Sequence, residues 1–460
     1  MFMSRIVRAA LRGLVVCAVV PWIPVPAIAA IPQIKHVVII IQENRSVDNL
    51  FHGLNAYLPK ADIANSGLDS KGRTIALKPV PLVSGYDLDH SHNAFLTMYD
   101  QGKMDGADRI ICAGYFQKCP ADPAYAYVRP GDVEPYFEIA RNYGFANRMF
   151  QSNQGPSFPA HQFLFGGTSQ ILTNSPYFAA ENAIGGVGCI APPNSYVAAI
   201  DPSGGSHTRV YPCFEHQTLA DLLDSPPGRP TRPISWRYYT LAAENIWTAP
   251  DAIRHLCEPA GSPARCTAAH WANGDIETWP PQILVDISKR QLSTVSWVIP
   301  TAQDSDHPAV NKGDGPSWVA SIVNAIGKSA YWSDTAIFIV WDDWGGWYDH
   351  VKPPIDPVYG FYEDGFRVPL LVVSPYTPKG YVSDKQHDFG SILRFVETAF
   401  DLGRIPPGNF ADARADSLED FFDFTKPPRP FTGIRQTVPT SRFLDRSRPM
   451  AAPDTDGDDQ

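Results

Sequence analysis

Two pairs of side chains with oxygen donors follow directly on apolar runs. Glu43 and Asn44 end one such run, and Asp342 and Asp343 end another. Adjacent carboxylates repel each other and are costly to remove from water unless a cation lies nearby. Carboxylate and amide oxygens suit hard or borderline divalent ions. The four residues therefore predict a divalent-metal site. The alternative is a pair of capped turns, in which only one aspartate points inward.

Ser157 lies in the segment G-P-S-F-P-A-H, and the proline two positions further on favours the start of a helix. A serine at a helix N-terminus lies where the helix dipole attracts phosphate and stabilises a developing alkoxide. A metal bound to the hydroxyl would activate it further as a nucleophile. The alternative is an ordinary serine N-cap.

Four histidines stand beside an aspartate in the sequence: His90, His307, His350 and His387. Such a histidine can donate a proton to a leaving oxygen, or can bind a metal while a carboxylate holds its other nitrogen. Each is a weak signal by itself, because isolated surface histidines are common.

The segments that must position these residues alternate between apolar runs and helical patterns. The runs are continuous, which is typical of parallel strands buried on both faces. Residues 317–326, with Ser317 as the N-cap, and residues 391–400 have helical patterns. We predict an α/β fold, a three-layer αβα sandwich with a mostly parallel central sheet, whose ligands bind at the carboxyl ends of the strands. The predicted strands are His36–Ile41, Ile234–Tyr239, Val295–Ile299, Ala336–Val340 and Leu370–Val373.

Residues 1–30 have the basic, apolar and small-residue regions of a cleaved signal peptide, which predicts a secreted or periplasmic protein. An uncleaved anchor is the alternative. We expect one catalytic domain over residues 31–440, with an irregular insertion near 55–135, and a flexible acidic tail over residues 441–460. The formal charge of −10 argues against nucleic-acid binding, which needs lysine and arginine patches.

Six cysteines follow the predicted signal peptide, and an even number in an exported chain predicts disulfides. Six cysteines allow fifteen sets of pairs. Pairing between neighbours in the sequence predicts Cys112–Cys119, Cys189–Cys213 and Cys257–Cys266. A thiolate zinc site is the rival interpretation, but the chain contains no C-x-x-C motif.

Six segments, in order, resemble the signatures of the bacterial phosphoesterase family. That family includes phospholipases C and acid phosphatases and has an alkaline-phosphatase-like fold. The resemblance spans residues 35–425. The segments are 43–51 (E-N-R-S-V-D-N-L-F), 102–106 (G-K-M-D-G), 155–159 (G-P-S-F-P), 305–308 (S-D-H-P), 341–354 (W-D-D-W-G-G-W-Y-D-H-V-K-P-P) and 365–369 (G-F-R-V-P) with the S-P that follows.

The resemblance implies a role for each matching residue. Ser157 would attack phosphorus and form a phospho-enzyme, while His307 and His90 would contact the phosphate or assist the leaving group. His350 is a weaker candidate for substrate binding, and His387 could replace a histidine that many relatives carry two positions later. One divalent ion, which could be zinc, calcium or manganese, would be surrounded by Glu43, Asn44, Ser157, Asp342 and Asp343.

The sequence thus predicts a secreted, metal-dependent phosphoric ester hydrolase that resembles phospholipase C. Its substrate would be a phosphoester, with phospholipid among the options, and any contact with a membrane surface would be at most transient. An acid phosphatase acting on phosphomonoesters is the main alternative. A sulfatase-type relative is disfavoured, because His161 stands where the sulfatase motif has arginine. A secreted binding protein without turnover is the third alternative.

Overall fold

The computed structural model describes residues 30–114, 119–205 and 208–453. The predicted signal peptide lies outside the described residues, apart from residue 30. Within the described ranges, no helix is both long enough and apolar enough to cross a membrane.

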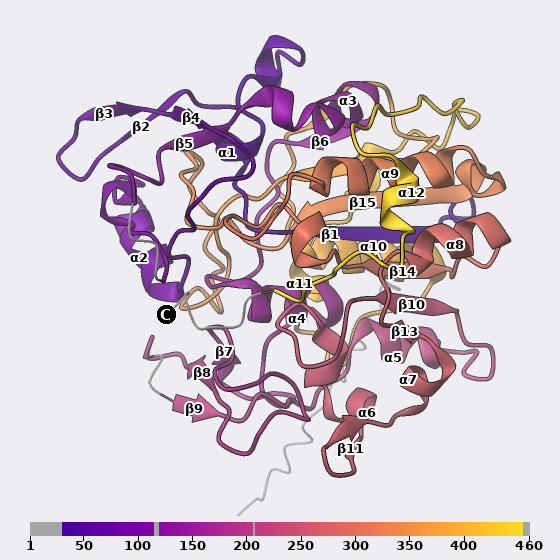
Figure 1. Ribbon diagram of the computed structural model, residues 1–460. Helices are drawn as coiled ribbons and strands as arrows, with labels where there is room; N and C mark the ends of the chain where they lie inside the picture. The colour runs from indigo at the N-terminus through magenta and orange to yellow at the C-terminus, as the bar shows by residue number, and fades with distance from the viewer. Residues whose placement is uncertain (1–29, 115–118, 206–207, 454–460) are drawn as a thin grey trace, which may run out of the picture.

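An eight-stranded sheet forms the centre of the molecule (Figure 1). All of its strands run in one direction except β16, which is antiparallel to both of its neighbours. The predicted mostly parallel sheet is confirmed, and each predicted strand belongs to it. Across the sheet the strands are β13 (Ile276–Glu277), β10 (Trp236–Tyr239), β14 (Val295–Val298), β1 (His36–Gln42), β15 (Thr335–Trp341), β16 (Leu370–Val373), β6 (Gly144–Ala146) and β17 (Tyr381–Ser383).

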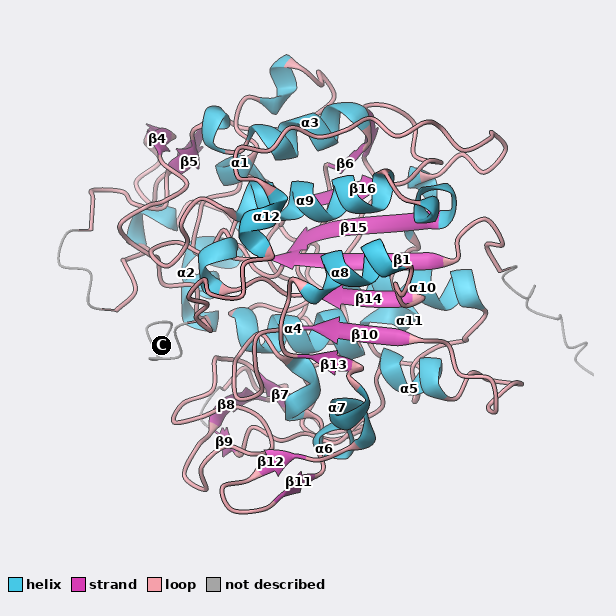
Figure 2. Ribbon diagram, turned by 45° about the vertical axis from the view of Figure 1, so that its right-hand side comes forward, coloured by secondary structure: helices cyan, strands magenta, loops and turns pink. Residues whose placement is uncertain are grey.

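Helices cover both faces of this sheet, so the predicted three-layer α/β sandwich is confirmed. Figure 2 shows α8, α9 and α12 in front of the strands, and α4, α10 and α11 behind them. One layer consists of α3 (Glu134–Asn142), α8 (Gln282–Lys289), α9 (Gly315–Gly327) and α12 (Thr440–Phe443). The other consists of α4 (Ser157–Gly166), α5 (Leu219–Asp224), α10 (Phe389–Phe400) and α11 (Ala411–Arg414).

The start of α9 differs from the prediction. The N-cap residue is Asp314, and Pro316 occupies the first turn, where a missing N–H costs no hydrogen bond. Ser317 lies inside the helix, and its Oγ accepts hydrogen bonds from the backbone N–H groups of Thr437 and Val438, both at 3.1 Å. Ser317 therefore holds the C-terminal segment and does not cap the helix.

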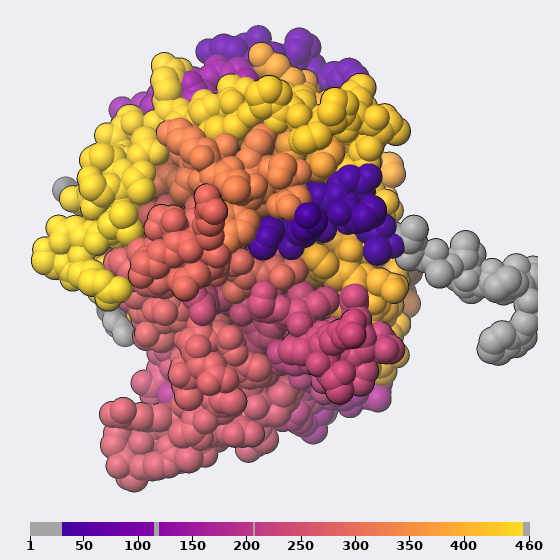
Figure 3. Space-filling view, turned by 90° about the vertical axis from the view of Figure 1, so that its right-hand side faces the viewer, coloured from indigo at the N-terminus to yellow at the C-terminus, as the bar shows by residue number. Residues whose placement is uncertain are grey.

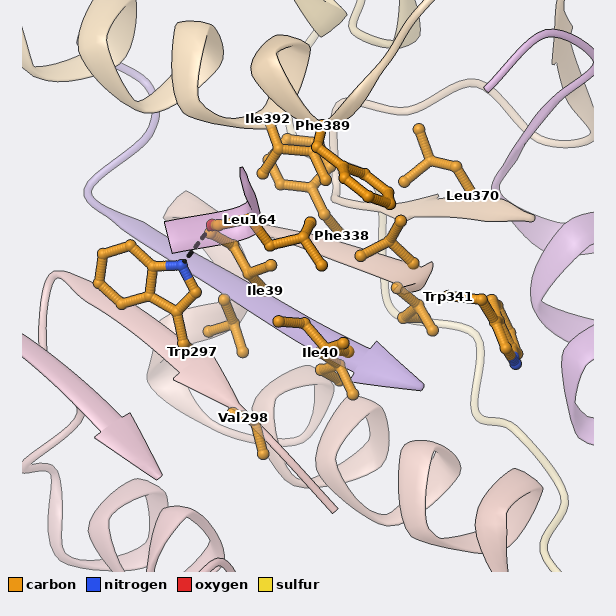
Figure 4. Packing of buried hydrophobic residues seen from close by; sticks show 14 of the residues in the cluster. Ile39, Ile40, Leu164, Trp297, Val298, Phe338, Trp341, Leu370, Phe389 and Ile392 are labelled. Carbon is orange, nitrogen blue, oxygen red and sulfur yellow. Dashed lines mark hydrogen bonds between the residues drawn. The ribbon is translucent and has the colours of Figure 1, made fainter. Parts of the chain in front are cut away.

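The main core fills the space between the sheet and its helices. Both faces of the central strands are apolar, because strands covered on two sides bury every side chain. Figure 4 shows Ile39 and Phe338 of the sheet packed toward Phe389 and Ile392 of α10. The indole N–H of Trp297 donates to the carbonyl of Leu164 at 3.1 Å, so this buried polar group is satisfied.

The stretch near 55–135, for which an insertion was predicted, contributes most of a second, smaller core, and we call it the lobe. Its regular elements are short, and α2 packs on side chains from the loop that follows β15. Phe95 of α2 contacts Trp344 and Phe366, and Tyr125 stacks on Tyr348. The lobe is thereby tied to the loop that carries Asp342 and Asp343. Its elements are β2 (Ser66–Leu68), β3 (Thr74–Ala76), β4 (Lys78–Val80), α2 (His92–Tyr99) and β5 (Ala126–Val128), whereas α1 (Val47–Leu50) precedes it and packs in the main core.

A third group of short elements lies beyond the β13 edge of the sheet, at the bottom of Figure 2. All three disulfides predicted from neighbouring cysteines are present: Cys112–Cys119, Cys189–Cys213 and Cys257–Cys266. Two of them lie in this region, where little regular structure holds the chain. The elements here are β7 (Phe178–Ala179), β8 (Val197–Ile200), β9 (Thr208–Val210), α6 (Arg254–Cys257), β11 (Pro259–Ala260), β12 (Arg265–Cys266) and α7 (Ala269–Asn273).

The C-terminal segment packs on the domain well beyond residue 441, where the tail was expected to begin. Figure 3 shows this segment, in yellow, spread over the surface. Phe443 is buried against Trp318, and the Arg448 guanidinium pairs with Asp304. The acidic residues after 453 lie outside the described part of the chain.

Candidate active site

The carboxyl ends of β1 and β15 meet at one edge of the sheet. These strands are parallel neighbours in which Gln42 pairs with Trp341, so the residues that follow them are adjacent. The backbone N–H of Asn44 donates to Asp342 Oδ1 at 3.0 Å. Gly345 passes so close to Asn44 that a Cβ at this glycine would lie 2.4 Å from the Asn44 carbonyl oxygen. The first glycine of the G-G pair is therefore required by this close approach.

Ser157 is the first residue of α4, and its hydroxyl lies beside the acidic pair. Its Oγ donates to Asp343 Oδ2 at 3.1 Å, while Asp343 Oδ1 accepts from the Gly345 N–H at 2.7 Å. Pro156 is the N-cap residue, so Ser157 is free of the capping role that was the alternative for it. A hydroxyl that donates to a carboxylate at a helix N-terminus has a proton acceptor in place and is near the positive end of the helix dipole.

His161 is a site residue that the sequence analysis did not identify as a metal ligand. It lies one turn after Ser157 in α4, and residues four apart on a helix share a face. Its Nε2 is 3.3 Å from Glu43 Oε1 and 3.8 Å from Asp342 Oδ2. One donor atom from each of the three residues lies within 4.8 Å of the others. The i, i+4 spacing from Ser157 was the signal that could have revealed it.

Six polar atoms of this cluster lack described hydrogen-bond partners although they are buried. Both carboxylate oxygens of Glu43, Asn44 Oδ1, Asp342 Oδ2 and both ring nitrogens of His161 are unsatisfied. Such groups are rare in folded proteins, because a buried polar atom without a partner costs free energy. Their types and their mutual approach fit a divalent cation with mixed oxygen and nitrogen ligands.

The charges of the cluster also fit a bound cation. Burial raises the pKa of Glu43 well above its usual value, and the nearby charges of Asp342 and Asp343 raise it further. Burial also lowers the pKa of His161 to about 4, so the imidazole is neutral near pH 7 and its lone pair is available. Arg45 donates to the carbonyl oxygen of Asp306, at 3.0 Å from Nε and 2.8 Å from Nη2, and no described contact joins it to Glu43.

His90 and His307 lie beside this cluster, with ring centroids 6.4 Å apart. The Nδ1–H of His90 donates to the Leu88 carbonyl at 2.6 Å, which leaves Nε2 to accept from Asn44 Nδ2 at 3.0 Å. This pairing turns the amide oxygen of Asn44 away from His90. His307 donates from Nδ1 to the Pro308 carbonyl at 2.8 Å and keeps 9% of its surface exposed.

His350 and His387 make their contacts elsewhere. His350 Nδ1 is 2.7 Å from Asp48 Oδ2 and its Nε2 is 3.1 Å from Asp62 Oδ1. Burial acts to lower the pKa of His350, but the hydrogen bond to Asp48 and the charges of Asp48 and Asp349 together outweigh it, so the pKa is raised. The Nε2 of His387 is 3.3 Å from Asp420 Oδ1. The proposed part of these two histidines in substrate binding stays a prediction.

Comparisons with known proteins show to which family the chain belongs. The model of the phosphoesterase family matches residues 34–403. Phospholipase C B of Mycobacterium tuberculosis is 25% identical, over 88% of this chain and 80% of its own length. The hemolytic phospholipase C of Pseudomonas aeruginosa is 23% identical over 86% of this chain, which covers 56% of that protein. A protein of the alkaline phosphatase superfamily from Vibrio parahaemolyticus has 10% identity and a TM-score of 0.35, over 81% of this chain and 67% of its own. Since the family match covers most of the sequence, the chain belongs to the phosphoesterase family and is a phosphoric ester hydrolase.

Proposed function

We propose that the protein is a secreted, metal-dependent hydrolase of phospholipase C type that works through a phosphoserine at Ser157. The observation that carries this proposal is the hydrogen bond from Ser157 Oγ to Asp343 Oδ2, made beside a buried set of unsatisfied ligand atoms. The three disulfides suit an oxidising compartment outside the cytoplasm.

One divalent ion would be held by Glu43, Asn44, Asp342, Asp343 and the Ser157 hydroxyl, with His161 as an additional nitrogen ligand. When bound, the ion would lower the pKa of the serine hydroxyl and offset the negative charge of the phosphate. His90 would act as a positioning residue for Asn44, because its Nε2 is already occupied as an acceptor of the amide N–H.

In the first step, Ser157 Oγ would attack phosphorus while its proton passes to Asp343. The oxygen–phosphorus bond forms as the bond from phosphorus to the leaving oxygen breaks. His307, which keeps some exposure at the site, is the residue we assign to give a proton to that oxygen. In the second step, water would attack phosphorus and give a proton to His307, while the bond from phosphorus to Ser157 Oγ breaks and this oxygen recovers the proton held by Asp343.

A phosphodiester such as a phospholipid is the proposed substrate class. Support comes from the two named phospholipases C, one of which is matched over four fifths of its length. The rival substrate is a phosphomonoester, as in an acid phosphatase. The two are separated by measuring phosphorus release from phosphatidylcholine and from p-nitrophenyl phosphate, side by side, with and without a chelator.

The test of the mechanism uses Ser157→Ala beside a matched serine variant. Ser169→Ala removes another buried hydroxyl, one that donates to the Ala179 carbonyl at 2.9 Å. We expect Ser157→Ala to lose activity by at least about 1000-fold while retaining metal, and Ser169→Ala to keep turnover near that of the wild type. Full activity of Ser157→Ala would overturn the proposal. Inactivity of the wild type toward all phosphoesters, with metal bound, would favour a binding protein instead.

A further inference from the structure

A second acidic pocket, of about 390 Å³, lies where the loop after residue 353 meets the start of α10. Asp356, Asp364, Asp388 and Asp416 line it, and Glu363 directly precedes Asp364 in the sequence. None of the residues that line the pocket contacts Glu43 or Ser157 among the described contacts. It is an unusual place for so many carboxylates, because buried acids normally lie beside an equal number of cations.

The cations of the pocket are already engaged. Arg414 pairs with Glu363 and lies 3.2 Å from Asp356 Oδ2, so its guanidinium balances these two acids. Lys385 lies 3.6 Å from Asp416 at the exposed rim. Asp364 and Asp388 make no ion pair with an arginine or lysine among the described contacts, although the charge of Arg414 acts on both from a distance.

Asp364 is the group that most clearly lacks a partner. Only 9% of the residue is exposed, and no described hydrogen bond reaches its carboxylate. Asp388, by contrast, caps α10 by accepting the Ser391 N–H at 3.1 Å. Burial raises the pKa of Asp364 well above its usual value, and the charge of Asp388 adds to the shift. A cation in the pocket would relieve both effects.

The carboxylate groups in the pocket favour an organic ammonium ion over a metal or a quaternary amine. In the described ranges, the groups of three ligand atoms close enough to hold a metal ion lie elsewhere. The described lining residues include two prolines and one histidine but no phenylalanine, tyrosine or tryptophan, whereas quaternary ammonium ions are bound by cages of such rings. A primary ammonium group carries three N–H donors, which match carboxylate acceptors.

We propose that this pocket binds a small primary amine as its ammonium ion, with the Asp364 carboxylate as the anchor. Hydrogen bonds join the segments that line the pocket to the loop that leads to Ser157. Gln154 Nε2 donates to the Asp364 carbonyl at 3.2 Å, and Ser152 Oγ accepts from the Phe389 N–H at 3.0 Å. An amine in the pocket would therefore contact residues tied to the nucleophile loop.

The experiment is calorimetric titration of the full chain at pH 8 and constant ionic strength. The probes are ethanolamine, tetramethylammonium and calcium, each as the chloride. The variants are Asp364→Asn and, as the matched control, Asp416→Asn, which removes a lining carboxylate at the exposed rim. We expect ethanolamine to bind the wild type at least about tenfold more tightly than tetramethylammonium does. Asp364→Asn should weaken ethanolamine binding at least about tenfold, and Asp416→Asn less than about threefold.

Three results would overturn the proposal. They are no ethanolamine binding by the wild type at millimolar concentration, equal ethanolamine binding by Asp364→Asn, and calcium binding that is lost in Asp364→Asn. Should Asp364→Asn not fold, Asp364→Ser removes the same charge with a smaller polar group and is judged by the same result. If neither variant folds, equal binding of ethanolamine and tetramethylammonium by the wild type overturns the proposal, and the tenfold preference upholds it. The titration measures binding without turnover, so its failure would leave the proposed phosphoester hydrolysis untouched.

Discussion

Glu43→Gln tests whether the buried carboxylates exist to hold a cation. The substitution keeps the shape of the side chain and removes one negative charge. Glu43 is fully buried, both of its oxygens lack hydrogen bonds, and burial followed by the charge of Asp342 raises its pKa. A carboxyl whose pKa is raised by folding destabilises the fold as the pH rises from the unfolded pKa toward the folded one. Each unit of that shift costs about 1.4 kcal/mol.

Without metal at pH 8, Glu43→Gln should therefore be more stable than the wild type. Metal binding should stabilise the variant less than it stabilises the wild type. An ion present at about 1000 times its Kd stabilises a protein by about 4.1 kcal/mol. If loss of the charged ligand weakens binding about 100-fold, the same concentration stabilises the variant by only about 1.4 kcal/mol. The metal-induced stabilisation should thus fall by about 2.7 kcal/mol.

The assay is thermal unfolding of both proteins in chelator and in metal. Glu397→Gln is the matched control, because burial and Asp412 raise the pKa of Glu397 to about 10 and this carboxyl is neutral at pH 8. Its metal-induced rise in Tm should equal that of the wild type. An unchanged metal response in Glu43→Gln, or a lower stability of that variant in chelator, would refute the reasoning.

His161→Asn should weaken zinc binding by at least about tenfold more than calcium binding, because imidazole suits zinc and calcium prefers oxygen. Competition with a coloured chelator measures both, and an equal loss would show that His161 is not a ligand. Arg367→Met should cost about 3–5 kcal/mol in urea unfolding, because it leaves Asp48 and Asp349 buried without their shared partner at 3.1 and 2.9 Å. Arg435→Met at the exposed surface should cost less than about 1 kcal/mol, and a similar cost for both variants would contradict the role of the buried ion pairs.

The sequence was sufficient to predict which strands carry the acidic residues, because buried parallel strands read as continuous apolar runs. It could not give the direction of β16. A run such as Leu370–Val373 buries every side chain, so its pattern is the same whether the strand is parallel or antiparallel to β15. The three disulfides were predictable because each joins cysteines close in the sequence, at separations of 7, 24 and 9 residues.

The histidines show why adjacency in the sequence is a poor guide to a site. His350 follows Asp349, yet its ring nitrogens contact Asp48 and Asp62, about 300 residues earlier in the chain. His161 was judged only by its departure from the sulfatase motif. Its approach to Glu43 and Asp342 depends on how α4 packs against the ends of β1 and β15, which is a tertiary contact that local patterns do not specify.

The central claim is that Ser157 is the nucleophile and becomes a phosphoserine during turnover. Its most direct test is to quench the metal-loaded enzyme in acid during turnover of p-nitrophenyl phosphate and of a phosphodiester, and to map phosphorylated peptides by mass spectrometry. We expect a phosphate on Ser157 from the monoester, and from the diester a phosphate on Ser157 that still carries the ester group that did not leave. We expect no phosphorylated serine in Ser157→Ala. Rapid turnover with no phosphorus on Ser157 at any quench time, combined with activity in Ser157→Ala, would contradict it.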